Sequence, residues 1–201
     1  MKKASVNENR YAEIDAFLQR CMPFSEEELD IFHSFLTYQK FKKKSILLQQ
    51  GEICKHESYI IKGCARTFYT DANGHDITLL FAVEDYWLGD IASFYKKTPS
   101  RFNIQLIEDT ELLQIDYEAK EALLEQLPKF ERVFRIMVQN HLASTQNRLV
   151  NNIAFTAAEN YAAFLKQFPN IPQRVPQHYI ASYLGISPEF LSKIRNDKKA
   201  I

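Results

Sequence analysis

The residues whose types and spacing point most clearly to a chemistry lie near the C-terminus, from 177 to 196. Ala181 is small where two helices would touch, and Gly185 stands where the chain would turn through positive φ. Ser187 and Pro188 supply an N-cap and a proline at the first helical position. Apolar residues occupy the spacings that bury the facing sides of both helices: Ile180, Leu184, Ile186, Leu191 and Ile194. This pattern predicts a helix-turn-helix.

The second helix of this motif would carry polar side chains outward, as a helix that reads base edges in a DNA major groove requires. A carboxylate such as Glu189 can accept from a cytosine amino group, and Lys193 can donate to guanine O6 or N7. Arg195, Lys198 and Lys199 are better placed for phosphates. The predicted DNA-contacting residues are Ser187, Pro188, Glu189, Ser192, Lys193, Arg195, Asn196 and Lys198. The alternative is a helical hairpin that only packs, with its charges in solvent.

Charge is distributed unevenly along the chain. The 25 Lys and Arg residues cancel the 25 Asp and Glu residues, which argues against a protein that coats nucleic acid indiscriminately. From 171 to 201, however, five basic residues stand against two acidic ones, which gives +3 there and leaves −3 for residues 1–170. The positive excess therefore coincides with the predicted DNA-binding motif.

The segment from about 38 to 115 has the pattern of an antiparallel β-domain, with short runs rich in Ile, Phe, Tyr and Thr between glycine-bearing turns. Asn73-Gly74 predicts a two-residue type I′ hairpin turn. Short strands at this spacing are typical of a jelly roll or similar barrel. The candidate strands are Tyr38–Phe41, Ser45–Gln49, Ser58–Lys62, Ala65–Tyr69, Asp76–Ala82, Ile104–Ile107 and Glu111–Ile115.

Helical patterns flank this β-region, so the predicted fold class is α+β. Ser25 and Glu28 form a capping box before a short helix, and a long helix is expected from Lys129 to Ile153. One face of the long helix carries apolar residues three, four or seven positions apart, namely Phe130, Phe134, Val138, Leu142 and Leu149. We interpret this face as a parallel dimer seam; a helix packed wholly on its own barrel is the alternative.

The expected domain division follows from these elements. Residues 1–128 would form a β-barrel sensor domain with N-terminal helices, and 129–153 the dimerisation helix. Residues 154–201 would form the helix-turn-helix domain.

In this order of elements the chain resembles the Crp/Fnr family of bacterial transcription regulators over nearly its whole length. Leu48–Glu52, Tyr59–Gly63 and Gly89–Ala92 look like the three glycine-marked turns of the family's cyclic-nucleotide-binding fold. The stretches Ile180–Glu189 and Leu191–Arg195 look like the form the helix-turn-helix takes in Bacteroidetes regulators. The resemblance implies a homodimer that binds a two-fold-related, inverted-repeat DNA site and contacts RNA polymerase.

The pattern departs from the family where a cyclic nucleotide would bind. The resemblance implies an acidic residue for the ribose, where Asp90 replaces the usual Glu, and an Arg-Ser pair for the phosphate, which Ser100-Arg101 reverses. A shift of one position displaces the guanidinium beyond hydrogen-bond reach. We therefore expect an effector other than cAMP, or none, although a register shift that restores Arg101 stays open. The corresponding pocket residues are Gly89, Asp90, Ile91, Ala92, Ser100 and Arg101.

Other chemistries find little support in the sequence. Cys21, Cys54 and Cys64 have no CxxC spacing and cannot supply the four thiols of an iron–sulfur cluster, while haem stays open because isolated histidines neither favour nor exclude it. A cupin-like metalloenzyme would need an HxH pair, which the chain lacks. We predict no enzyme, no metal and no cofactor. An interaction module that has lost DNA binding is the remaining alternative.

Composition gives the expected location. Hydrophobic residues make up 46% of the chain, which favours a folded globular protein. The apolar runs are far shorter than the roughly 20 residues that span a bilayer, and the first ten residues are polar. We expect a cytoplasmic protein with no membrane contact.

Overall fold

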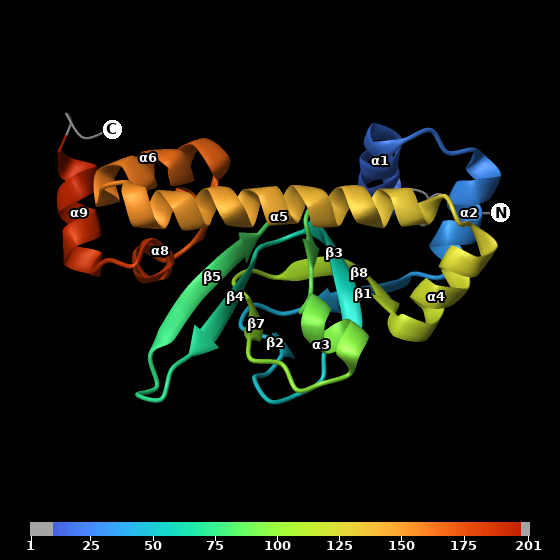
Figure 1. Cartoon of the computed structure of the whole chain (residues 1–201), viewed down its shortest axis with the longest axis horizontal. Coiled ribbons are helices and arrows are strands. Elements are labelled where there is room, and N and C mark those ends of the chain that lie inside the picture. The colour runs from blue at the N-terminus through green and yellow to red at the C-terminus, as the bar shows by residue number, and fades with distance from the viewer. Residues whose placement is uncertain (1–9, 198–201) are drawn as a thin grey trace. The chain divides into compact units, whose positions relative to one another are not determined.

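The computed structural model describes residues 10–197 and contains two antiparallel sheets together with helices on both sides of them in the sequence (Figure 1). In chain order the elements are α1 (Ala12–Cys21), α2 (Glu26–Ser34), β1 (Thr37–Phe41), β2 (Ile46–Leu48), β3 (His56–Lys62), β4 (Ala65–Thr70), β5 (Asp76–Ala82), β6 (Trp87–Leu88), α3 (Ile91–Lys96), β7 (Asn103–Leu106), β8 (Thr110–Asp116), α4 (Tyr117–Gln126), α5 (Phe130–Ala154), α6 (Ala157–Gln167), α7 (Ile171–Arg174), α8 (Gln177–Leu184) and α9 (Pro188–Asn196). The predicted α+β class, with a long helix between a β-domain and C-terminal helices, is confirmed.

The chain divides into two compact units. The first unit runs to Thr67 and resumes over Phe81–Val138; the second consists of Phe68–Leu80 and the residues from Gln139 onward. The tip of the β4–β5 hairpin therefore belongs to the same unit as the C-terminal helices. The division at 128 and 153 expected from the sequence stays a prediction.

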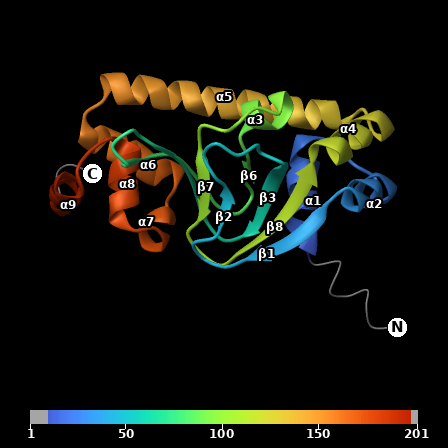
Figure 2. The same ribbon diagram turned by 90° about the horizontal axis from the view of Figure 1, so that it is seen from below.

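The strands form two four-stranded sheets, in the orders β1-β8-β3-β6 and β2-β7-β4-β5. Figure 2 shows β1, β8 and β3 side by side, and their pairing is antiparallel. Side chains alternate between the two faces of a strand. In β3, Ile60 points into a cluster shared with the second sheet, whereas Tyr59 points into a cluster shared with helices. The first sheet is therefore covered on both faces.

The two hydrophobic clusters explain where the helices of the first unit lie. Phe32 from α2, Leu123 from α4 and Phe130 from α5 join Tyr59 and Leu113 of the first sheet in one buried cluster. The predicted capping box begins α2, since the Ser25 hydroxyl accepts from the Glu28 N–H and the Glu28 carboxylate accepts from the Ser25 N–H. Thr156 and Glu159 form a second box that begins α6.

The turn between β4 and β5 corrects one prediction. A type I′ turn requires positive φ at both central residues, but the non-glycine residues with positive φ in the described range are Lys44, Asp85 and Lys97. Instead Gly74 alone has positive φ, +82°, and its N–H donates to Asp71 O over 3.0 Å. The turn is longer because the Asp71 carboxylate accepts from two backbone N–H groups of the loop.

Three short elements were not expected. They are β6, α3 and α7, which have two, six and four residues. Elements this short carry too few residues for a period to appear in the sequence.

Candidate functional site

The helices α8 and α9 have the tight connection that the sequence predicted. Gly185 ends α8 with φ +69°, and the Ile186 N–H donates to Ala181 O over 3.0 Å. The Ser187 hydroxyl then accepts from the Phe190 N–H over 3.2 Å and so caps α9. Ile180, Leu191 and Ile194 are buried, as their spacing predicted, and Ala181 is buried too. Leu184 and Ile186, which were expected to be buried, are only half-buried. The result is a compact helix-turn-helix.

The predicted DNA-contacting residues that the structure describes are all exposed: Ser187, Pro188, Glu189, Ser192, Lys193, Arg195 and Asn196. Lys198 lies outside the described residues. Sequence reasoning passed over Phe190, whose side chain is 48% exposed in the first turn of α9. Its exposure could have been noticed from the sequence, because Leu191 and Ile194 already fill the buried positions of this helix.

The side chain of Glu189 in α9 is suited to accept hydrogen bonds. Hydrogen bonds from its own backbone N–H and from the Ser187 hydroxyl lower the pKa of Glu189. The Glu189 side chain is therefore a carboxylate at neutral pH. It can accept from an amino group but cannot donate.

Within the second unit, the β4–β5 hairpin is bound to α8 by a serine whose hydroxyl is both a hydrogen-bond acceptor and a donor. The Thr78 N–H donates to Ser182 Oγ over 2.9 Å, and Ser182 Oγ donates to Asp76 O over 2.9 Å. Thr78 and Asp76 lie in β5, and Ser182 lies near the end of α8. The first helix of the helix-turn-helix thus carries two direct hydrogen bonds to the hairpin.

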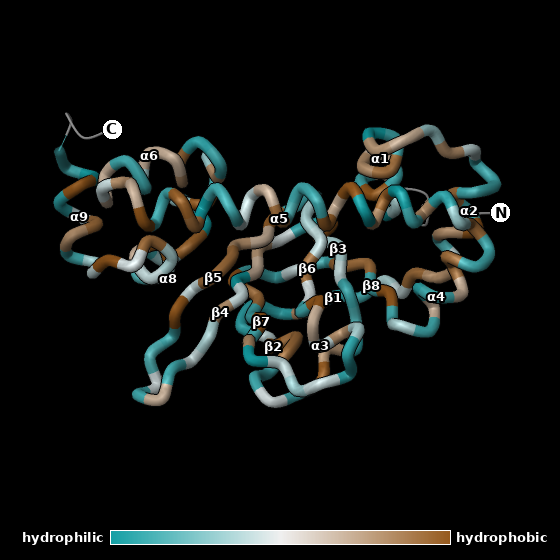
Figure 3. Tube along the Cα trace, in the orientation of Figure 1, coloured by the Kyte–Doolittle hydropathy of each residue, from teal (hydrophilic) through white to brown (hydrophobic). Residues whose placement is uncertain are grey.

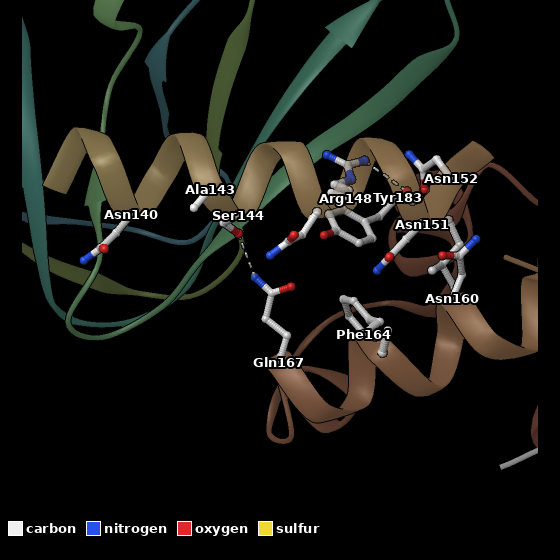
Figure 4. A pocket seen from close by; sticks show the side chains of 13 residues that line it. Asn140, Ala143, Ser144, Arg148, Asn151, Asn152, Asn160, Phe164, Gln167 and Tyr183 are labelled. Carbon is white, nitrogen blue, oxygen red and sulfur yellow. Dashed lines mark hydrogen bonds between the residues drawn. The ribbon is translucent and has the colours of Figure 1, made fainter. Parts of the chain in front are cut away.

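Arg148 of α5 completes this contact (Figure 4). Its guanidinium donates to Leu79 O and, over 3.1 Å, to Tyr183 O, and its Cζ lies 4.0 Å from the Tyr183 ring centroid. Burial lowers the pKa of Arg148. Its Nε is buried without a hydrogen-bond partner, so the side chain is held by carbonyl groups and a ring.

A groove of about 360 Å³ lies beside Arg148, between α5 and α6 (Figure 4). Amide side chains dominate its lining, and Gln167 Nε2 donates to Ser144 Oγ over 3.5 Å. The lining amides are Asn140, Asn147, Asn151, Asn152, Asn160 and Gln167. These groups are uncharged and suit water as well as any polar ligand.

The predicted seam residues of α5 lie in two different environments. Phe130 and Phe134 are 0% and 8% exposed and belong to the core of the first unit. Val138, Leu142 and Leu149 are 51%, 54% and 60% exposed. Figure 3 shows hydrophilic and hydrophobic residues mixed along the whole of α5. The part of α5 available to a partner therefore begins near Val138.

The predicted effector residues are brought together around Asp90, but in an arrangement without a cation. Asp90 caps α3, where its Oδ1 accepts from the Ala92 and Ser93 N–H groups, and its Oδ2 accepts from Ser100 Oγ over 2.7 Å. Both carboxylate oxygens are thus engaged by the protein. Arg101 is exposed, whereas Ser100, which precedes it, is buried. Gly89 precedes Asp90, and Ile91 is exposed on α3.

Within residues 10–197, no group of three or more His, Cys, Asp or Glu side chains is arranged so that it could hold a metal ion. Cys21, Cys54 and Cys64 form no disulfide bond. None of the described helices is both long enough and apolar enough to cross a membrane.

Comparison with known proteins agrees with this geometry. Residues 38–127 match the model of the cyclic nucleotide-binding domain family. The cAMP-activated global transcriptional regulator CRP of Escherichia coli is 23% identical over 133 residues, which cover 66% of this chain and 63% of CRP. The chain thus matches less than two thirds of that relative's length. Regulatory protein HlyX of Actinobacillus pleuropneumoniae is 23% identical over 88% of this chain and 78% of HlyX.

Among solved structures, FixK2 from Bradyrhizobium japonicum superposes with a TM-score of 0.70 and 16% identity, over 80% of this chain and 82% of FixK2. This likeness shows the fold, and it agrees with the match of residues 38–127 to the cyclic nucleotide-binding domain model. The similarity to CRP and HlyX, at 23% identity, agrees with the resemblance to Crp/Fnr regulators seen in the sequence motifs. Both CRP and HlyX are named as regulators.

Proposed function

We propose that this chain is a sequence-specific DNA-binding transcription regulator that acts as a homodimer on an inverted-repeat site. The observation that carries the proposal is α9, a capped helix with its apolar side buried and its polar side chains exposed. Helices of this kind place their first turns against major-groove base edges. Homology to CRP and HlyX, both named as regulators, supports the same conclusion.

In this proposal each exposed side chain of α9 has a role set by its chemistry. Glu189 accepts from a cytosine amino group, and Lys193 donates to guanine. Ser192 and Asn196 lie on the same outward face and contact base edges or phosphates, and Arg195 neutralises a phosphate. The dimer places two such helices about one DNA turn apart, roughly 34 Å, so that they read inverted half-sites.

The proposed dimer forms along the exposed part of α5. Val138, Leu142 and Leu149 follow each other at spacings of four and seven residues, which keeps them on one face. Apolar side chains exposed along such a stripe are the usual signature of a helix that pairs with another. The asparagine-lined groove faces α6 instead, so pairing would leave that groove open.

We further propose that the pocket around Asp90 does not bind a cyclic nucleotide. A phosphodiester needs a cation or several aligned N–H donors. Ser100 occupies the position implied for arginine and donates to Asp90, while Arg101 is exposed. An effector, if the chain uses one, therefore binds through other chemistry. Contact with RNA polymerase is part of the same proposal by analogy with the family.

The experiment that tests DNA binding compares Lys193→Ala with a control, Lys166→Ala, which removes an exposed lysine of α6. If Lys193 reads a base, its loss should weaken binding to a selected site by about 1–3 kcal/mol per half-site and leave binding to random DNA nearly unchanged. Lys166→Ala should change neither. Equal losses on both DNAs would assign Lys193 to a phosphate.

Salt distinguishes this proposal from an interaction module that has lost DNA binding. A protein that neutralises several phosphates loses affinity steeply as salt rises, whereas a hydrophobic contact with a protein does not. If the chain does not bind duplex DNA even at low salt, the result would favour the interaction module.

A further inference from the structure

We propose that the groove between α5 and α6 is a binding site for a small organic anion that carries several hydroxyl groups, such as a sugar acid. The groove has a volume of about 360 Å³, and residues of α5, α6 and α8 line it (Figure 4). Sites that bind small molecules in proteins typically measure roughly 300–1,000 Å³. The groove is therefore large enough for a ligand of the size of a single sugar.

The charge that would attract an anion is that of Arg148, which is one of the lining residues. Its guanidinium donates to the carbonyl oxygens of Thr78, Leu79 and Tyr183, and across residues 10–197 no carboxylate pairs with it. Its Nε is buried without a hydrogen-bond partner. Buried charges in proteins are normally paired with an opposite charge. The positive charge of Arg148 therefore has no counter-ion in the described part of the chain.

The rest of the lining would not repel an anion. The described residues that line the groove include no Asp or Glu, and none besides Arg148 carries a charge. An anion in the groove would therefore be attracted by Arg148 without meeting a like charge. A divalent cation such as Ca²⁺ or Mg²⁺ would need carboxylate ligands, which this lining does not offer.

Amide side chains supply the contacts that select hydroxyl groups. Asn140, Asn147 and Asn151 follow each other on α5 at spacings of seven and four residues, which keeps them on one face of the helix. Asn160 and Gln167 lie across the groove on α6 (Figure 4). An amide group both donates and accepts hydrogen bonds, as a hydroxyl group does. Within the described residues the side chains of Asn147, Asn151 and Asn160 make no hydrogen bond, so they are available to a ligand.

Tyr183 of α8 connects the groove to the charge of Arg148. Its side chain lines the groove, and the Arg148 Cζ lies 4.0 Å from its ring centroid. On the groove side the Tyr183 ring packs against Phe164 of α6, with ring centroids 5.3 Å apart. The guanidinium is thus held next to the wall of the groove, and the carbon atoms of a ligand would meet aromatic edges there.

The groove would stay accessible in the proposed dimer. Leu149 of the proposed seam lies two residues beyond Asn147, which turns it through about 200° around the axis of α5. Because α8 is the first helix of the helix-turn-helix, a molecule bound here would contact the DNA-binding motif directly. The groove is therefore the place where an effector could act on DNA binding, a role that rests on the proposed function.

The test measures binding of D-gluconate to the full chain by NMR of side-chain amides, with the ionic strength held constant by sodium chloride. We expect shifts at Asn147, Asn151 and Gln167 that saturate in the millimolar range. Sorbitol, in which an alcohol group replaces the carboxylate, should bind about tenfold more weakly. Acetate, which has the charge without the hydroxyl groups, should also bind about tenfold more weakly.

Two variants assign the roles of charge and amide. Asn147→Ala should weaken gluconate binding about tenfold, whereas Asn170→Ala, which removes an amide at the start of α7 outside the groove, should leave it unchanged. Arg148→Met should abolish the preference for gluconate over sorbitol. Arg132→Met, which removes an exposed arginine of α5 outside the groove, should preserve that preference.

Asn147→Ala keeps the test decisive if Arg148→Met does not fold, because the Asn147 side chain bonds to no other described residue. Equal affinity for gluconate and sorbitol, a gluconate affinity that Asn147→Ala leaves unchanged, or no shifts at the amides of the groove would each overturn the proposal. DNA plays no part in this readout, so its outcome is independent of whether the chain binds DNA.

Discussion

Lys120 of α4 is the buried charge whose removal should cost the first unit most. Its side chain is 3% exposed, and its Nζ donates to Glu57 of β3, which is 13% exposed. The Lys120 Nζ also lies 3.8 Å from the centroid of the Phe134 ring and 5.1 Å from that of Tyr95. The ammonium group of Lys120 in α4 thus contacts side chains of β3, α3 and the first turns of α5.

The change Lys120→Met keeps the length of the side chain and removes its charge. Breaking a buried ion pair typically costs about 3–5 kcal/mol, because the remaining charge stays buried without a partner. We therefore expect Lys120→Met to lower the free energy of unfolding of the first unit by that amount. The double variant Glu57→Leu, Lys120→Met removes both charges and should be more stable than Lys120→Met, since apolar replacement of a whole buried pair is often neutral.

The assay has a natural reporter, because Trp87 is the single tryptophan of the chain. It packs against Tyr59 and Phe134, at ring-centroid distances of 5.6 and 6.2 Å, inside the first unit. Its fluorescence in urea therefore follows that unit alone. Lys96→Met, at an exposed position of α3, is the control and should stay within about 0.5 kcal/mol of the wild type. A Lys120→Met protein as stable as this control would show that the pair of Lys120 and Glu57 contributes nothing to the stability of the first unit.

Three more predictions concern the second unit and α5. Leu142→Glu should convert a dimer into a monomer in sedimentation, because it places a charge on the proposed seam, whereas Asn140→Glu, on the groove side of α5, should not. Arg148→Met should speed amide exchange of Thr78 about tenfold, since it frees the hairpin carbonyls from the guanidinium; unchanged exchange would contradict this. Replacing thymine by uracil in the DNA site should weaken wild-type binding but not that of Phe190→Ala, if exposed Phe190 contacts a thymine methyl group; equal effects would contradict it.

Much of the fold could be predicted because the informative elements are long or strongly patterned. The capping box at Ser25, the long α5 and the helix-turn-helix each satisfy several local constraints at once. The turn type predicted for Asn73-Gly74 was wrong, because the Asp71 carboxylate stabilises a longer loop. The Asn-Gly dipeptide alone does not indicate this. Elements as short as β6 leave no period to detect.

The candidate site was predictable at the level of the motif and less so at the level of contacts. Exposure of Glu189 and Lys193 follows from the helical period once Leu191 and Ile194 are assigned to the core. The core position of Phe130 could not be predicted in this way. An apolar stripe on α5 gives the same sequence pattern whether it packs on its own sheet or on a partner subunit. The bonds from Ser182 to the hairpin join residues about a hundred positions apart, and no local pattern predicts them.

Sequence-specific DNA binding by a dimer can be tested by selecting the fragments that the purified chain binds from a pool of random duplex DNA, with and without cAMP. We expect enrichment of an inverted repeat with half-sites about one DNA turn apart, to the same degree in both conditions. Leu142→Glu should lose this enrichment, since it separates the two subunits. Absence of any enriched sequence would contradict the claim of a sequence-specific regulator, and enrichment only with cAMP would contradict the proposed loss of nucleotide binding at Asp90 and Ser100.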